Sequence, residues 1–162
     1  MRLILIICIF ILNSCSLSHI DNSNSNYRLY QIYDMEDVLQ DYYTNDLRRI
    51  SPGLACGDFK MENNVGCFKL LVDKRGGKVT KLIYHELSTG DKLELYEFDP
   101  PINYVLIEKI YESKLENSNA LPEHEEVILD AGQPSLRLVF FGKSAVVFYW
   151  KNGTFHKIWT AD

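Results

Sequence analysis

The sequence predicts an α+β domain in which one N-terminal helix packs on an antiparallel β-sheet of about six or seven strands. A helical pattern of apolar residues comes first in the domain, over residues 34–50. Short β-type segments separated by turn residues follow it, and the last of them form a β-meander. The chain is 46% hydrophobic, which is sufficient for one domain with a real core.

The helix is predicted from apolar spacing and from the residues at its two ends. Apolar residues recur every three or four positions: Met35, Val38, Leu39, Tyr42, Leu47 and Ile50. Asp34 is the expected N-cap, because its carboxylate can accept hydrogen bonds from the free amides of a first turn. Ser51-Pro52-Gly53 ends the helix. We expect the helix to cover strands that would otherwise present apolar, exposed edges.

Five β-type segments are predicted between the helix and the meander. They cover residues 67–72, 78–86, 93–98, 104–111 and 126–129. Asp99-Pro100-Pro101 is expected to end the third segment, because proline cannot donate a hydrogen bond to a sheet. Residues 104–111 are apolar on both faces over much of their length, which predicts a central strand.

The meander is predicted over the last part of the chain, in residues 136–141, 145–150 and 154–160. Gly142-Lys143 joins the first two segments. Asn152-Gly153 joins the last two, and this dipeptide is a strong signal for a tight hairpin because both residues tolerate positive φ angles. No internal repeat or second domain is apparent.

The N-terminus has the pattern of a secretory signal peptide, predicted over residues 1–14. Arg2 adds a positive charge to that of the α-amine, and residues 3–12 are all apolar when Cys8 is counted with them. Ten residues in a helix span about 15 Å, which is half of the roughly 30 Å hydrocarbon core of a bilayer. The segment is therefore too short for a comfortable transmembrane anchor.

Leu12-Asn13-Ser14-Cys15 resembles the lipobox of bacterial lipoproteins. The resemblance implies cleavage before Cys15 and attachment of lipid to this residue, so that acyl chains hold the protein on the bilayer. Because Ser16 and not an aspartate follows the cysteine, the resemblance implies the outer membrane, with the domain facing the periplasm. An ordinary signal peptide with Cys15 as a plain thiol and a short uncleaved anchor are the alternatives.

The segment after the lipobox, residues 15–26, is predicted to be the lipidated cysteine and a flexible tether. It is rich in serine and asparagine and carries too few apolar residues to fold by itself. Residues 27–162 then form the single α+β domain.

The charge of the chain excludes one class of partner. The formal net charge is −5, and removal of Arg2 with the signal leaves 16 basic against 22 acidic residues. Binding of nucleic acid requires clustered lysine and arginine to neutralise phosphates, and the sequence has no strongly basic patch. We therefore expect no nucleic-acid partner.

Cys56 and Cys67 are predicted to form a disulfide, because an exported chain meets an oxidising compartment. With lipid on Cys15 they are the only remaining pair after cleavage. A zinc site is the alternative, but two thiols this far apart lack the further ligands that zinc needs. No metal site and no cofactor is therefore predicted.

No catalytic residue is predicted, and the chain is expected not to be an enzyme. Nucleophile, phosphate-binding and dinucleotide-binding motifs are absent from the sequence. His85 alternates with its neighbours on a strand and is expected to be a half-exposed structural residue. His124 lies in a charged loop, and His156 is expected to be exposed on a hairpin.

Three functions fit such a chain. The first is a binding or inhibitor module, of the general build of immunity lipoproteins and lysozyme inhibitors, that acts on another envelope protein or on a basic toxin or muramidase. Its expected contact regions are the loops at residues 57–66 and 112–125. The second is a structural or assembly lipoprotein of the cell envelope. The third is a hydrolase of peptidoglycan or lipid, which would require a cleft with convergent polar groups.

Overall fold

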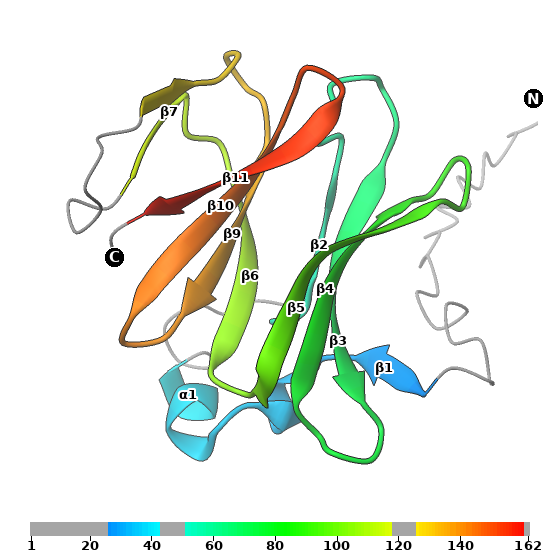
Figure 1. The fold of residues 1–162 in the computed structure, drawn as a ribbon, viewed down its shortest axis with the longest axis vertical. Coiled ribbons are helices and arrows are strands. Elements are labelled where there is room, and N and C mark those ends of the chain that lie inside the picture. The colour runs from blue at the N-terminus through cyan, green and yellow to red at the C-terminus, as the bar shows by residue number, and fades with distance from the viewer. Residues whose placement is uncertain (1–25, 43–50, 118–125, 161–162) are drawn as a thin grey trace, which may run out of the picture.

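The computed structural model describes residues 26–42, 51–117 and 126–160, and nearly all of them lie in or between β-strands (Figure 1). A five-stranded antiparallel sheet, which we call sheet A, contains β1 (Tyr27–Leu29), β2 (Leu54–Gly57), β3 (Gly66–Asp73), β4 (Val79–Glu86) and β5 (Lys92–Ile102). A four-stranded sheet, sheet B, contains β6 (Val105–Ile110), β9 (Ser135–Phe140), β10 (Ser144–Lys151) and β11 (Thr154–Thr160). A small third sheet pairs β7 (Lys114–Glu116) with β8 (Glu126–Ile128).

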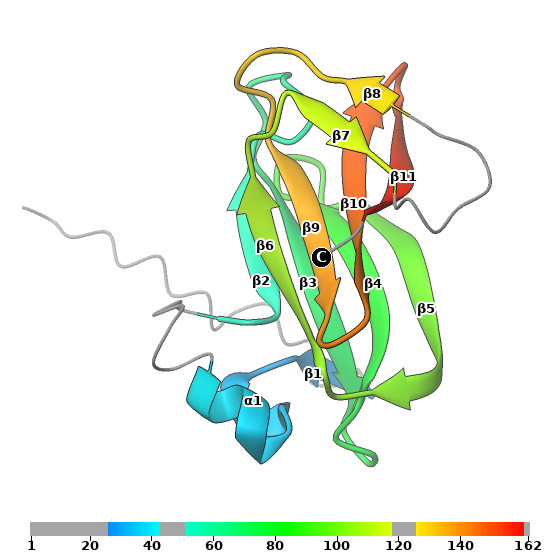
Figure 2. The ribbon, with the colours of Figure 1, turned by 90° about the vertical axis from the view of Figure 1, so that its left-hand side faces the viewer.

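The core lies between sheets A and B, which pack face to face as a β-sandwich (Figure 2). Alternate residues of β3, Phe68, Leu70 and Val72, point inward and are fully buried. Val146 and Phe148 of β10 meet them from the other sheet. This alternation follows from the two-residue period of a strand, which sends successive side chains to opposite faces.

The predicted α+β fold is wrong, because a second sheet covers the apolar face that the helix was expected to cover. In the described part of residues 34–50, the only α-helix is α1 (Asp37–Tyr42), which lies at one end of the sandwich (Figure 1). Residues 43–50 lie outside the described residues. Asp34 does not cap a long helix: it lies in the short 3-10 helix η2 (Ile32–Asp34), and Met35 after it is extended. Among the described residues, no helix is long and apolar enough to cross a membrane.

Two further strand predictions are wrong, and both concern strands that lie at the edge of a sheet. β5 does not end at Asp99 but continues through Pro100 and Pro101 to Ile102. It is an edge strand of sheet A, where a residue without an N–H can face away from the ladder. β6 was expected to be central, but it is an edge strand of sheet B. Its edge is nevertheless covered, since the Ile107 amide donates to the Pro52 carbonyl at 2.9 Å.

The small third sheet covers the outer face of sheet B. Leu115 of β7 and Val127 of β8 pack against outward-facing side chains of β10 and β11, including Val147 and Ile158. All four side chains are buried. Sheet B is therefore covered on both faces, which explains why its strands read as nearly continuous apolar runs in the sequence.

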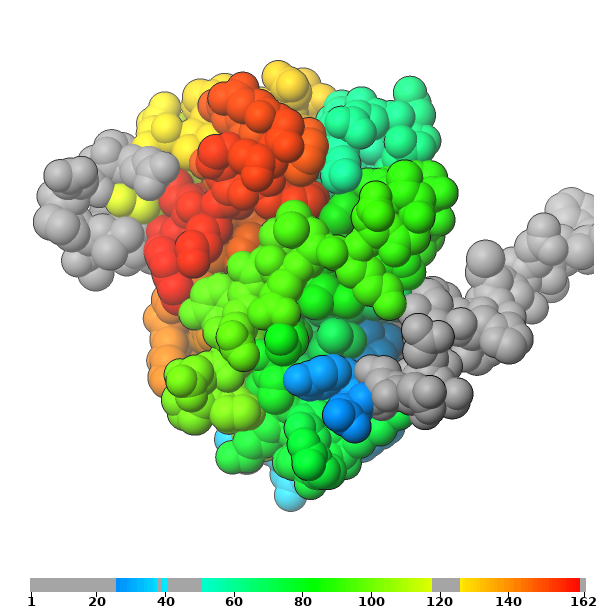
Figure 3. All heavy atoms as spheres, turned by 45° about the vertical axis from the view of Figure 1, so that its right-hand side comes forward, coloured from blue at the N-terminus to red at the C-terminus, as the bar shows by residue number. Residues whose placement is uncertain are grey.

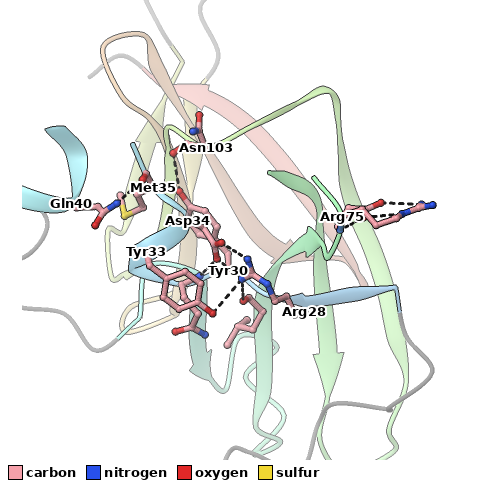
Figure 4. Close-up of polar contacts among 11 residues, drawn as sticks. Arg28, Tyr30, Tyr33, Asp34, Met35, Gln40, Arg75 and Asn103 are labelled. Atoms are coloured by element: carbon pink, nitrogen blue, oxygen red, sulfur yellow. Dashed lines mark hydrogen bonds and ion pairs between the residues drawn. The ribbon is translucent and has the colours of Figure 1, made fainter. Parts of the chain in front are cut away.

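Polar contacts fix the N-terminal strand and η2 to the sandwich (Figure 4). Arg28 forms a two-pronged ion pair with the carboxylate of Asp34, whose side chain is only 3% exposed. The same carboxylate accepts the Gln31 amide at 2.9 Å. Tyr30 is fully buried and its hydroxyl donates to the Asn103 carbonyl at 2.9 Å. Burial raises the pKa of the Tyr30 phenol, so this donor stays protonated at neutral pH.

Replacing Asp34 with alanine is expected to lower the free energy of unfolding by about 2 kcal/mol, because the change leaves the Arg28 guanidinium and the Gln31 amide without their acceptor. Urea denaturation measures this. Arg75→Ala is the control, since it removes an ion pair with Asp73 in which the arginine is 84% exposed, and such pairs contribute little. Equal midpoints for the two variants would contradict the role given to Asp34.

Candidate functional site

Several loops meet at the end of the sandwich opposite α1. Figure 3 shows the β2–β3 loop (teal), the β4–β5 turn (green) and the β10–β11 hairpin (orange to red) gathered on this end. A groove of about 270 Å³ lies between the β2–β3 loop, the β8–β9 loop and the β10–β11 hairpin. We call it the end groove. Its walls contain Lys60, Met61, Ile128, Asp130, Gln133 and Trp150.

The β2–β3 loop is closed by a disulfide at its base. Cys56 and Cys67 are cross-strand partners, and their sulfur atoms are bonded at 2.09 Å. Neither cysteine is therefore a free thiol for catalysis or metal binding. Because the bond joins the two ends of the loop, it removes much of the conformational freedom of the residues between them.

Asp58 holds the loop from within. Its carboxylate accepts the amides of Glu62 at 3.0 Å and of Asn63 at 2.8 Å. Met61 and Asn63 both have a φ of 59°, in the left-handed region. This region is uncommon for a side chain such as methionine, and it persists only where surrounding contacts impose it. These contacts restrict the conformations that the loop can adopt.

Lys60 attaches the loop to the sandwich. Its ammonium lies 2.7 Å from the Glu86 carboxylate, whose side chain is 6% exposed. The same ammonium lies 5.3 Å from the centre of the Tyr84 ring and 4.9 Å from that of Trp150. Cation–π attraction to the two rings adds to the ion pair with Glu86. Burial and the Glu86 charge raise the pKa of Tyr84, whose hydroxyl donates to Glu86 at 3.4 Å.

Phe59 is the second attachment point of the loop. It is 1% exposed, and its ring meets Phe68 edge to face with centroids 4.6 Å apart. Phe155 of β11 joins the same cluster through Phe68 and through Tyr84. Edge-to-face aromatic pairs contribute about 0.5–1.5 kcal/mol beyond the area that they bury. The loop is therefore anchored by neighbouring residues of opposite character, one apolar and one charged.

The opposite wall of the end groove is also fixed. Gln133 is buried, and its side-chain amide donates to the Trp150 carbonyl at 2.7 Å. This bond joins the β8–β9 loop to β10. Leu129, at the start of the same loop, is 6% exposed and packs in the cluster beneath the small third sheet.

Large apolar side chains are exposed around the end groove. Met61 is 50% exposed on one wall and Ile128 is 58% exposed on the other. Val65 of the β2–β3 loop and Leu87 of the β4–β5 turn are 49% and 46% exposed, and the Leu87 amide donates to the Val65 carbonyl. Grouped apolar residues within a polar surround are typical of a surface that contacts another protein.

The residues singled out in the sequence have different outcomes. The loop at residues 57–66 forms a wall of the end groove. His85 and His156 are not brought together: His85 lies on β4 beside Lys69, whereas His156 on β11 stacks on Tyr149. Cys15 and His124 lie outside the described residues, as does most of the loop at residues 112–125. In the described part of the chain, no group of three or more His, Cys, Asp and Glu residues could hold a metal ion.

Sequence reasoning missed the far wall of the end groove. Ile128 and Gln133 come from a segment more than sixty residues after Met61, and Trp150 comes from a third segment. No local pattern connects the three segments, because only the packing of the two sheets places them together. Comparison with known proteins found no family model, no curated protein and no solved structure that matches this chain.

Proposed function

We propose that this chain is a non-enzymatic binding module that acts on another protein of the bacterial envelope through the end groove. The observation that carries the proposal is Met61, which is half exposed on a loop held by the disulfide, by Asp58 and by the Lys60 and Phe59 anchors. A fixed loop is already ordered before it binds, so little conformational entropy is lost in the complex.

The chemistry of the groove supports a protein partner and not a reaction. Its walls combine the exposed apolar side chains of Met61 and Ile128 with the polar side chains of Asp130, Lys151 and Asn152. Lys60, in one wall of the groove, is paired with the Glu86 carboxylate, whose side chain is buried. Methionine adapts its shape to a partner surface, and central apolar contacts contribute most of the affinity in protein interfaces.

The lipid anchor at Cys15 and the tether at residues 15–26 belong to the same proposal. They would hold the domain on the periplasmic side of the outer membrane, within reach of toxins and muramidases that enter the envelope. The formal net charge of −5 favours a basic partner, since opposite charges raise the rate of encounter.

The proposal is tested with the purified full chain against a panel of purified basic muramidases and wall-directed toxins. We expect one member to bind and to lose activity. Met61→Ser combined with Ile128→Ser is expected to weaken this binding by about thirtyfold, corresponding to about 2 kcal/mol. Calorimetric titration gives the affinity, and both changes leave the net charge unaltered.

Tyr33→Ser is the matched control. Tyr33 is 65% exposed and lies in η2, away from the end groove. The Tyr33→Ser change removes a side chain larger than that of Met61 or Ile128, without a change of charge. The affinity for the bound partner is expected to stay within about twofold of that of the natural chain. Equal affinities for the control and the double variant would exclude the end groove as the contact. Binding only to envelope assembly proteins would favour the structural role instead.

A further inference from the structure

A row of basic side chains crosses the outer face of sheet A. Cys67 of β3, His85 of β4 and Lys92 of β5 are successive cross-strand partners. Lys69 lies two residues along β3 from Cys67 and so points to the same face. Since Phe68 and Tyr84 face the core, all of these side chains face away from it.

Lys69 is buried in an apolar surround. It is 5% exposed, and its partners on the neighbouring strands are Leu54 and Ile83. Its ammonium nitrogen lies 2.8 Å from Nδ1 of His85. Because the ammonium can only donate, Nδ1 accepts, and the ring hydrogen of His85 is on Nε2. His85 therefore keeps Nε2–H as a second donor.

Among the described residues, no carboxylate forms an ion pair with a member of this row. Glu94 on the same face is held by Lys81 at 2.7 Å. Burial and the charge of Lys92 lower the pKa of Lys69, and burial, Lys69 and Lys92 lower the pKa of His85. Both shifts have the same two causes, which are burial and the positive charge of neighbouring side chains.

We propose that Lys69, His85 and Lys92 form a binding site for a phosphate group. The three residues supply donors from three adjacent strands, and a phosphate has several acceptor oxygens that can take them at once. A bound phosphate would also supply the missing negative charge. Inorganic phosphate and the headgroup of a phosphatidic acid carry the same group. This site is independent of the end groove.

The test uses the full chain in a chloride buffer at constant ionic strength, with the ring nitrogens of His85 followed by NMR. Inorganic phosphate is expected to shift these resonances in a saturable manner. Lys92→Gln removes one charged donor and is expected to weaken the affinity about tenfold. Lys74→Gln removes the same charge from the exposed turn after β3 and is expected to leave the affinity unchanged.

A second variant tests the buried Lys69 instead of the exposed Lys92. Lys69→Met keeps a long side chain in the apolar surround, and we expect it to fold with an unchanged or higher thermal midpoint in chloride. Phosphate should raise the midpoint of the natural chain, since a ligand of the folded state stabilises it, but not that of Lys69→Met. An equal rise in both proteins would overturn the proposal.

A soluble short-chain phosphatidic acid separates the two sources of phosphate. A response of His85 to both ligands supports a site for the phosphate group itself. A response to the phosphatidic acid alone supports a site for a lipid headgroup. If neither ligand shifts His85, or if Lys92→Gln and Lys74→Gln change the affinity equally, the site does not exist.

Discussion

Replacing Gly66 with alanine is expected to lower the free energy of unfolding by about 2–3 kcal/mol, because an added methyl group has no space. Its Cβ would lie 2.0 Å from the hydroxyl oxygen of Tyr84 and 2.2 Å from the adjacent ring carbon. Tyr84 cannot easily move, since it is 2% exposed and packs against Phe68 and Phe155. Urea denaturation of the variant measures the loss.

Gly66→Ala should also weaken binding at the end groove. The Tyr84 ring contacts the Lys60 ammonium. A shift of Tyr84 would therefore disturb the contact by which Lys60 anchors the β2–β3 loop. Gly76→Ala is the control, because no atom lies within 4 Å of the added Cβ and the φ of Gly76 is not positive. A stability loss of the same size in Gly76→Ala would show that the contact with Tyr84 is not the cause.

The double variant Cys56→Ser/Cys67→Ser is expected to lose about 3 kcal/mol of stability, from the chain entropy that a loop of this size regains on unfolding. The sequence separation of the two cysteines is 11. The folded state should change locally as well. Without the bond, the amides of Glu62 and Asn63 should exchange with solvent faster, since their acceptor on Asp58 is no longer held in place.

Hydrogen exchange distinguishes this account from a purely global effect. The amides of the β10–β11 ladder, for example Val147 and Ile158, serve as the internal reference in the same sample. We expect the ratio of loop to ladder protection to fall in the double variant. An unchanged ratio would mean that Asp58, Lys60 and Phe59 fix the loop without help from the disulfide.

Local signals predicted the parts of the fold that depend on local chemistry. The final hairpin is the clearest example, since Asn152 and Gly153 have φ angles of 53° and 79° and connect β10 to β11. The Cys56–Cys67 disulfide was also predicted from the small number of cysteines in the chain. In both cases the residues that determine the structure are close together in the chain.

The fold class depended on contacts that are distant in the sequence. Residues 34–50 have a helical spacing, but Asp34 is engaged by Arg28 and Gln31, and Met35 is extended. Nothing in the local pattern shows that sheet B will cover sheet A. The predicted helix is present in part as α1 (Asp37–Tyr42), but contacts with distant residues hold Asp34 and Met35 outside it. Residues 54–57 were missed as a strand because four residues carry too weak a pattern.

Only part of the candidate site could be predicted, because its walls come from segments that are distant in the sequence. Residues 57–66 were recognisable as an exposed loop between two cysteines, and they form one wall of the end groove. Ile128 and Trp150 gave no signal, since an apolar residue in a strand segment usually lies in the core. Lys69 gave none either, because its burial comes from the pairing of β2, β3 and β4.

The most direct test of the central claim, that the end groove holds a protein partner, is photo-crosslinking in cells that produce the chain. A photoreactive residue is placed at position 61 or 128, in the walls of the groove, or at position 33 as the reference. We expect one discrete adduct, with the same envelope protein, from positions 61 and 128 and none from position 33. Adducts of equal yield from all three positions, or none from positions 61 and 128, would contradict the account.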